Sequence, residues 1–258
     1  MVGDVKLDMY KRGQLTIFVI LGILIVLGIL VFLFFFAKNI VPDYSAPKSP
    51  RGVLEKCIGD SVQPSINAVL DYGGLISPIV SIPYKNHSYN YLCYTDQYYT
   101  KCYNYYPMLN SIVEEQIRQN TVDLVDDCFI FLLDDYKSRG FDISGGELEY
   151  SVEVVPGSVR LRISKDISTT NGESADVFSD FDMKIPSDLF ELIEIARNVV
   201  NQEAEFCYFE NNGFMVMYPL YNMSRVDYDE SKIYEVENRK TKEVFKFAIR
   251  SCAYAPGF

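Results

Sequence analysis

The chain contains no tryptophan and only one histidine, and its acidic residues outnumber its basic ones. A Ser-His hydrolase would have to use His87 as its base, but the chain offers no G-x-S-x-G nucleophile for it. Because there is no C-x-x-C pair either, a zinc site is not predicted. Gly145-Gly146 precedes a predicted strand and lacks the lysine of a phosphate-binding loop. The sequence therefore predicts no metal and no cofactor, and it leans away from an enzyme.

The charge is strongly acidic. The formal net charge is −11 and the pI is about 4.7. This charge repels phosphate backbones, and no basic patch interrupts it, so we expect no nucleic-acid partner. On an exported domain, an acidic surface also maintains solubility.

One long hydrophobic run, Leu15 to Ala37, carries no charged residue. As a helix it would be about 35 Å long, enough to cross a hydrocarbon layer of about 30 Å. No A-x-A cleavage pattern follows it, so removal by signal peptidase is not expected. We therefore predict a single-pass protein of the cell membrane that contacts lipid through residues 15–37. Residues 1–14 would be a short cytoplasmic or signal segment, 38–52 a proline-containing stalk, and 53–258 an extracytoplasmic domain.

All six cysteines follow the hydrophobic run, and their even number suits an oxidising compartment. Spacing alone cannot select a pairing, and free buried thiols are the alternative. We favour pairs between neighbours in the predicted structure: Cys57 with Cys128 between two helices, Cys93 with Cys102 within one loop, and Cys207 with Cys252 across the final sheet. Two Asn-x-Ser triplets, at Asn86 and Asn222, are candidate glycosylation sites and also favour an outer location.

The residues Lys11-Arg12-Gly13-Gln14, directly before the hydrophobic run, resemble the class III signal peptides of archaeal type IV pilin-like proteins. The resemblance implies cleavage between Gly13 and Gln14, followed by packing of the hydrophobic helix into a filament core. Phe18 stands at the fifth mature position, where pilins of that family usually carry a glutamate.

The rest of the chain resembles a group of uncharacterised archaeal membrane-anchored surface proteins. The similar features are Cys57-Ile58, Gly73-Gly74, the stretch Phe181 to Pro186 and the stretch Phe245 to Ala248. This resemblance implies an architecture of one anchor and one outer domain, and it implies no activity.

The hydrophobic spacing after the stalk predicts an α+β domain with a mostly antiparallel sheet and three main helices. Pro64 is expected to kink or interrupt the first helix. The helices are predicted over 53–72, from Pro107 to a stop at Gly140, and after Pro186. The strands are predicted over 147–155, 158–165, 176–185, 213–219, 233–237 and 244–250.

Nine tyrosines lie between Tyr84 and Tyr106. So many amphipathic rings are hard to bury together, and exposed tyrosine is typical of adaptable binding surfaces. We predict a contact loop for an envelope protein or glycan. The alternative is a disulfide-closed insertion whose rings cover the domain. The candidate binding residues are Tyr98, Tyr99, Tyr103, Tyr105 and Tyr106.

The function that these patterns favour is a membrane-anchored, non-enzymatic cell-surface protein with a role in adhesion or envelope assembly. One alternative is a pilin-like filament subunit processed after Gly13, which would form homo-oligomers. Another is an envelope hydrolase that uses a carboxylate pair. The candidate carboxylates are Asp126 with Asp127, Asp134 with Asp135, and Asp227 and Asp229 with Glu230.

Overall fold

A computed structural model describes residues 19–29, 50–138, 142–171 and 174–257. The chain divides into two compact units, Met1–Lys48 and Ser49–Phe258. In the first unit, residues 19–29 are helical. Within the described residues, no helix is both long and apolar enough to cross a membrane. The remainder of the predicted span 15–37 lies outside the described residues, so the membrane anchor stays a prediction.

Two helices form one side of the second unit. Helix α2 spans Pro50–Asp71 and helix α3 spans Leu109–Ser138. They run antiparallel, because a disulfide joins the early part of α2 to the late part of α3 and Gly74, just after α2, lies against Leu109 at the start of α3. The predicted stop at Gly140 lies outside the described residues.

The start of α2 corrects the predicted stalk, because Pro50, Arg51 and Gly52 belong to the helix. Proline suits the first helical position, where its missing N–H leaves no hydrogen bond unmade. At the other end, Gly73 and Gly74 have φ of +63° and +91° and terminate the helix.

Helix α2 also continues without interruption through Pro64, against the expectation that the proline would break it. Val62 and Ile66, on either side of the proline, are fully buried. In addition, the Asn120 amide of α3 donates to the Ser65 hydroxyl at 2.8 Å. Packing against α3 therefore stabilises the helix by more than the loss of the one backbone hydrogen bond that the proline removes.

The first sheet is antiparallel throughout and packs against α3. It contains β4 (Asp142–Gly145), β5 (Glu149–Val155), β6 (Ser158–Asn171) and β7 (Ser174–Pro186). The predicted hairpin of β5 and β6 turns at Gly157, which has a φ of +73°. One face buries Val152, Val154 and Leu161, whereas the other carries ion pairs such as Arg160 with Asp182.

The second sheet has the order β1-β2-β10-β9-β8, with β3 also paired to β2. Its strands are β1 (Ser81–Tyr84), β2 (His87–Tyr94), β3 (Tyr103–Asn104), β8 (Tyr221–Tyr228), β9 (Ser231–Asn238) and β10 (Val244–Arg250). Among the described strands, only the β2–β10 pairing is parallel, so the prediction of an α+β fold with a mostly antiparallel sheet is confirmed. Helix α4 (Leu189–Phe206) contacts this sheet through β9 and β10.

The strand predicted at 213–219 is wrong, because these residues lie mostly in the short helix α5 (Asn211–Met217). The Glu210 side chain accepts hydrogen bonds from the backbone N–H groups of Asn212 and Gly213 and so caps a helix. The strand of this region is β8, which begins only at Tyr221.

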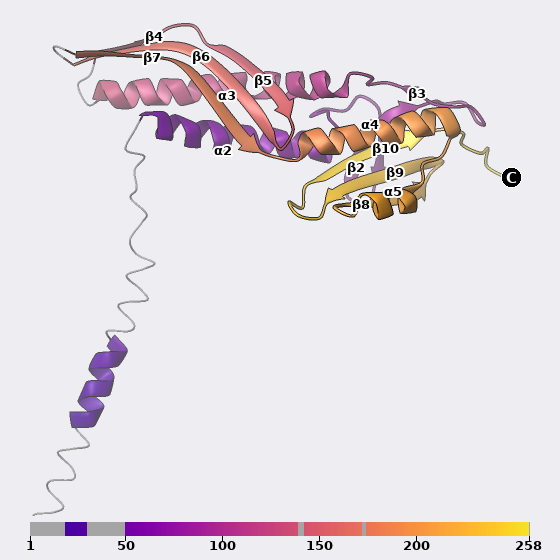
Figure 1. Cartoon of the computed structure of the whole chain (residues 1–258), viewed down its shortest axis with the longest axis horizontal. Helices are drawn as coiled ribbons and strands as arrows, with labels where there is room; N and C mark the ends of the chain where they lie inside the picture. The colour runs from indigo at the N-terminus through magenta and orange to yellow at the C-terminus, as the bar shows by residue number, and fades with distance from the viewer. Residues whose placement is uncertain (1–18, 30–49, 139–141, 172–173, 258) are drawn as a thin grey trace, which may run out of the picture. The chain divides into compact units, whose positions relative to one another are not determined.

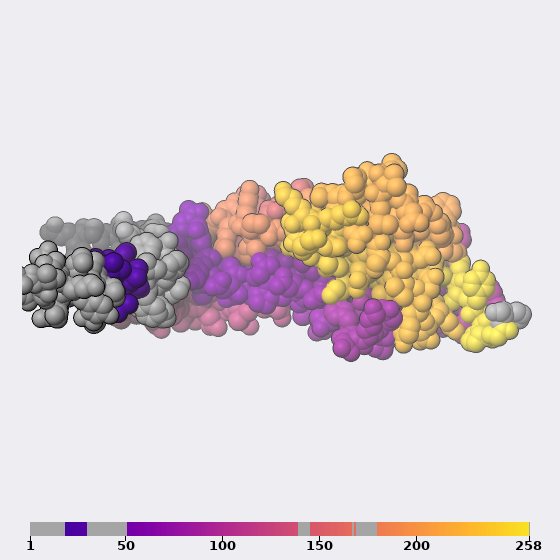
Figure 2. All heavy atoms as spheres, turned by 90° about the horizontal axis from the view of Figure 1, so that it is seen from below, coloured from indigo at the N-terminus to yellow at the C-terminus, as the bar shows by residue number. Residues whose placement is uncertain are grey.

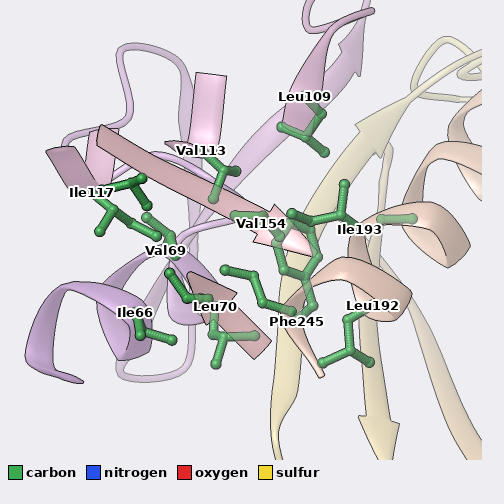
Figure 3. Close-up of a cluster of buried hydrophobic side chains, with 14 of the residues drawn as sticks. Ile66, Val69, Leu70, Leu109, Val113, Ile117, Val154, Leu192, Ile193 and Phe245 are labelled. Atoms are coloured by element: carbon green, nitrogen blue, oxygen red, sulfur yellow. The ribbon is translucent and has the colours of Figure 1, made fainter. Parts of the chain in front are cut away.

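The described part of the second unit contains two buried hydrophobic clusters, and the larger one draws on most of its elements. Side chains from α2, α3, β5, α4 and β10 converge in it (Figure 3). The start of α2 and the first sheet lie at one end of this unit, whereas the end of α4, the end of β10 and the C-terminal segment lie at the other (Figure 1). On the face in Figure 2, the purple surface around β1 and β2 borders the orange and yellow surface of the later strands, in agreement with the β2–β10 pairing.

Candidate binding site

The predicted tyrosine loop is partly a strand in the interior of the second sheet. Strand β2 lies between β1 and β10, and it buries Tyr89 and Tyr91. The Tyr89 hydroxyl donates to Glu235 at 2.6 Å, and the Tyr91 hydroxyl lies 2.7 Å from that of Ser231. Burial raises the pKa of both phenols. These two tyrosines therefore belong to the packing of the domain.

The candidate binding tyrosines separate into three places. Tyr98 and Tyr99 lie in the bend after β2 and are 38% and 57% exposed. Tyr103 and Tyr105 are also exposed, but they lie on and after β3. Tyr106 is half-buried and packs against the core. Only Tyr98 and Tyr99 adjoin the pocket that is described next.

A pocket of about 520 Å³ opens between the end of α4, the turn from β8 to β9 and the C-terminal segment. Tyr208, Tyr228 and Tyr254 line it and are all exposed. The Tyr254 ring packs edge-on against Tyr99 at a centroid distance of 5.7 Å. The Tyr98 hydroxyl donates at 3.0 Å to Glu230, which also lines the pocket. We call Tyr98, Tyr99, Tyr208, Tyr228 and Tyr254 the tyrosine rim.

Strained backbone gathers around this pocket. Positive φ is unfavourable for residues other than glycine, and such residues cluster at functional sites. Seven non-glycine residues in the described part of the chain have positive φ, and five of them line or adjoin the pocket: Tyr99, Cys207, Asp229, Glu230 and Cys252. The packing around the pocket therefore holds its backbone in conformations that isolated residues avoid.

The turn from β8 to β9 shows how one strained residue is held. Asp229 and Glu230 are the two turn residues, and both have positive φ, as a type I′ hairpin requires. Arg250 donates to the Glu230 carboxylate at 2.7 Å, and Tyr98 donates to its other oxygen. The hydrogen bond from Arg250 is the main cause that lowers the pKa of Glu230. The turn, β10 and the tyrosine bend are thus joined by one carboxylate.

A buried carboxylate holds Lys232, which lines the pocket. Glu203 of α4 has no exposed surface, and it accepts from the Tyr234 hydroxyl at 2.5 Å and from the Lys232 ammonium group. The same ammonium group donates to the carbonyl oxygen of Cys207 at 2.6 Å. Burial, followed by the charge of Glu203, raises the pKa of Tyr234. A buried charge of this kind is tolerated only because both oxygens have partners.

All three predicted cysteine pairs lie at disulfide distance. The Cys93–Cys102 pair joins the end of β2 to the segment before β3. The Cys207–Cys252 pair joins the end of α4 to the segment after β10, so it does not cross the sheet as predicted. Both of its cysteines line the pocket.

The two candidate glycosylation sites differ in accessibility. Asn86 is exposed in the turn between β1 and β2. Asn222 is half-buried on β8, where its amide lies 3.5 Å from Glu237. Nothing in the structure tests either modification. The candidate processing site at Gly13 and Gln14 lies outside the described residues.

Three of the candidate catalytic carboxylates are each engaged with a different cation. Lys165 donates to Asp126, Arg225 lies 3.5 Å from Asp227, and Glu230 is held by Arg250. In the described part of the chain, no group of three or more His, Cys, Asp or Glu side chains is arranged to hold a metal ion.

Sequence reasoning missed Glu203 and three of the five rim tyrosines, Tyr208, Tyr228 and Tyr254. Each of these tyrosines is isolated in the sequence and joins the others only through folding. A usable signal was present at Asp229-Glu230, an acidic pair between two alternating apolar segments, which is the pattern of a hairpin turn.

Comparison of the chain with protein-family models, with curated proteins and with solved structures found no match. The functional interpretation therefore depends on the geometry of the site.

Proposed function

We propose that this chain is a membrane-anchored surface protein whose outer domain binds an envelope partner through the tyrosine rim. The observation that carries the proposal is the meeting of five exposed tyrosines, from four separate parts of the chain, around one pocket. Exposed tyrosine offers a large contact area and a hydrogen-bonding hydroxyl, and it loses little conformational entropy on binding.

The position of the pocket suits this role. The start of α2 lies at one end of the second unit, and the end of α4 and the C-terminal segment lie at the other (Figure 1). Residues just after α4 and in the C-terminal segment line the pocket. The proposed anchor, residues 15–37, precedes Pro50 in the sequence. A binding surface far from the point of attachment is accessible to partners in the envelope.

The cysteine pairs support an outer location for the domain. All six cysteines lie at disulfide distance in three pairs, and disulfides form and persist in oxidising compartments. Protease added to intact cells tests this part of the proposal directly. We expect digestion of the domain after residue 52 from outside. Complete protection, with cells shown to be unbroken, would contradict an outer location.

The binding role is tested with two matched variants of the full-length chain. The rim variant combines Tyr98→Ser, Tyr99→Ser and Tyr254→Ser, and the control variant combines Tyr103→Ser and Tyr105→Ser, which are exposed but away from the pocket. Each protein is cross-linked to envelope membranes of the source cells, and the captured partner is quantified. We expect at least tenfold less capture by the rim variant and unchanged capture by the control. Equal capture by all three proteins would refute the binding role of the rim.

A further inference from the structure

More acidic than basic side chains line the pocket, and two of the carboxylates have no strong ion pair within the protein. Two basic residues, Arg225 and Lys232, face three acidic ones, Asp227, Asp229 and Glu230. Lys232 is already committed to Glu203 behind it, and Glu230 is neutralised by Arg250. The available carboxylates are therefore those of Asp227 and Asp229.

These two carboxylates are open to a ligand. The side chain of Asp227 is 69% exposed, and its contact with Arg225 is long, at 3.5 Å. Asp229 is exposed at the tip of the turn. Among the described residues, no lysine or arginine forms an ion pair with Asp229. A cation entering the pocket would thus meet two carboxylates without displacing a strong internal ion pair.

The aromatic side chains at the pocket already bind cations within the protein. The Arg225 guanidinium lies 5.7 Å from the centre of the Tyr208 ring, and the Arg250 guanidinium lies 5.1 Å from that of Tyr98. A cation over the face of a tyrosine is attracted by the ring quadrupole, and aromatic rings combined with acids are a known means of holding organic cations. Tyr254 has an exposed ring at the same pocket and no cation of this protein over it in the described part of the chain. Tyr228 is also partly exposed there without a cation, and its ring packs against Tyr84 at a centroid distance of 5.0 Å.

We propose that the pocket binds the ammonium or guanidinium group of a lysine or arginine side chain on the partner protein. The carboxylates of Asp227 and Asp229 would neutralise the charge, and the rings of Tyr228 and Tyr254 would cover the alkyl stem. The inference depends on the proposed binding function, and it names the chemistry of the partner. The net charge of −11 favours approach of a basic partner over an acidic one.

The probe for this inference is a dansyl-labelled tetralysine amide, titrated into the full-length chain in nonionic detergent at low and at physiological salt. The pocket variant combines Asp227→Asn and Asp229→Asn. The control variant combines Asp123→Asn and Asp127→Asn, which removes the same charge from two exposed positions on α3. We expect the pocket variant to weaken binding about tenfold and the control less than twofold. Equal weakening by both variants would show general charge attraction and overturn the inference.

Two further measurements identify the contribution of the rings and the source of the cation. Tyr254→Phe retains the ring face and should retain binding, whereas Tyr254→Leu should weaken it severalfold; equal affinities of the two variants would contradict a cation–π contact. Free butylamine at the same concentration of ammonium groups should not displace the peptide. If it does, the site binds small amines and the assignment to a protein side chain is wrong.

The outcomes also separate this inference from the proposed function. Suppose that the rim variant loses the envelope partner, whereas the pocket variant still binds both the envelope partner and the tetralysine probe. The proposed binding role then stands, and the proposal of a cationic ligand is wrong. If neither variant affects capture of the envelope partner, the proposed function itself fails.

Discussion

The two ends of the second unit are built differently. The end that contains α2, α3 and the first sheet has regular helices and strands, apolar inner faces and charged outer faces. The end that contains the second sheet has the buried Glu203 and the exposed tyrosines. In the described part of the chain, every non-glycine residue with positive φ belongs to this second end or to its connecting loops. We interpret the first end as the stable support and the second as the binding end.

The comparison suggests that stability and recognition are separated in this domain. Residues in regular elements stabilise the fold through apolar burial, which favours no particular ligand. Strained turns and buried charges lower stability unless other contacts compensate, and five of the seven positive-φ residues in the described part of the chain lie around one pocket. The predictions below test this separation, from the largest expected change in stability to the smallest.

The disulfide between α2 and α3 should make the largest contribution to stability. Its cysteines are 71 residues apart, against 9 for Cys93 and Cys102. On the chain-entropy estimate, replacing Cys57 and Cys128 by alanine lowers the unfolding free energy by about 4 kcal/mol, and replacing Cys93 and Cys102 lowers it by about 2.5 kcal/mol. Urea unfolding of the full-length chain in detergent measures both. A larger loss from the short pair would contradict the proposed support role of the helical end.

Glu203 should be the most sensitive residue at the binding end. Glu203→Ala leaves the Lys232 ammonium and the Tyr234 hydroxyl without their shared acceptor, so we expect a loss of about 3 kcal/mol in the same unfolding assay. Glu205→Ala, on the same helix but exposed, should change stability by less than about 0.5 kcal/mol. Similar losses from both substitutions would mean that the buried carboxylate is not a structural centre of the pocket.

The tyrosine rim should matter for binding and hardly at all for folding. Tyr98→Ser, Tyr99→Ser and Tyr254→Ser together should change the unfolding free energy by less than about 1 kcal/mol, because all three rings are exposed. The matched pair Tyr89→Phe and Tyr91→Phe removes two buried hydroxyls and should cost about 1 kcal/mol for each broken hydrogen bond. If the rim variant is the less stable of the two, the rim is part of the core and the division fails.

The smallest effect is the pH response of the β8–β9 turn. The pKa of Glu230 is lowered from its ordinary value of 4.5, chiefly by the hydrogen bond from Arg250. A depressed carboxyl pKa stabilises the fold above the ordinary value, and this contribution is lost as pH falls through the folded-state pKa. The stability difference between the native chain and Glu230→Gln should therefore be present at pH 7 and disappear as pH falls below the ordinary value of 4.5 and through the lower folded-state pKa. A difference that grows on acidification would have the wrong sign.

Much of the end that contains α2, α3 and the first sheet was predictable from the sequence, whereas most of the candidate binding site was not. The apolar spacing along α3 and the hairpin around Gly157 are local patterns, and the structure contains both. Strand β2 was missed because it is rich in tyrosine and pairs in parallel with β10, more than 150 residues later. The pocket combines residues from the ends of several elements. Tyr208, Tyr228 and Tyr254 have no shared local pattern, so only the tertiary arrangement brings them together.

Tyrosine footprinting of the bound protein tests the central claim most directly. The full-length chain is iodinated with and without saturating envelope partner, and the modification of each tyrosine is read by mass spectrometry. We predict that Tyr98, Tyr99, Tyr228 and Tyr254 become protected while Tyr103 and Tyr105 remain reactive. Unchanged reactivity at the rim, with protection at Tyr103 and Tyr105 instead, would place the binding surface elsewhere and contradict the account.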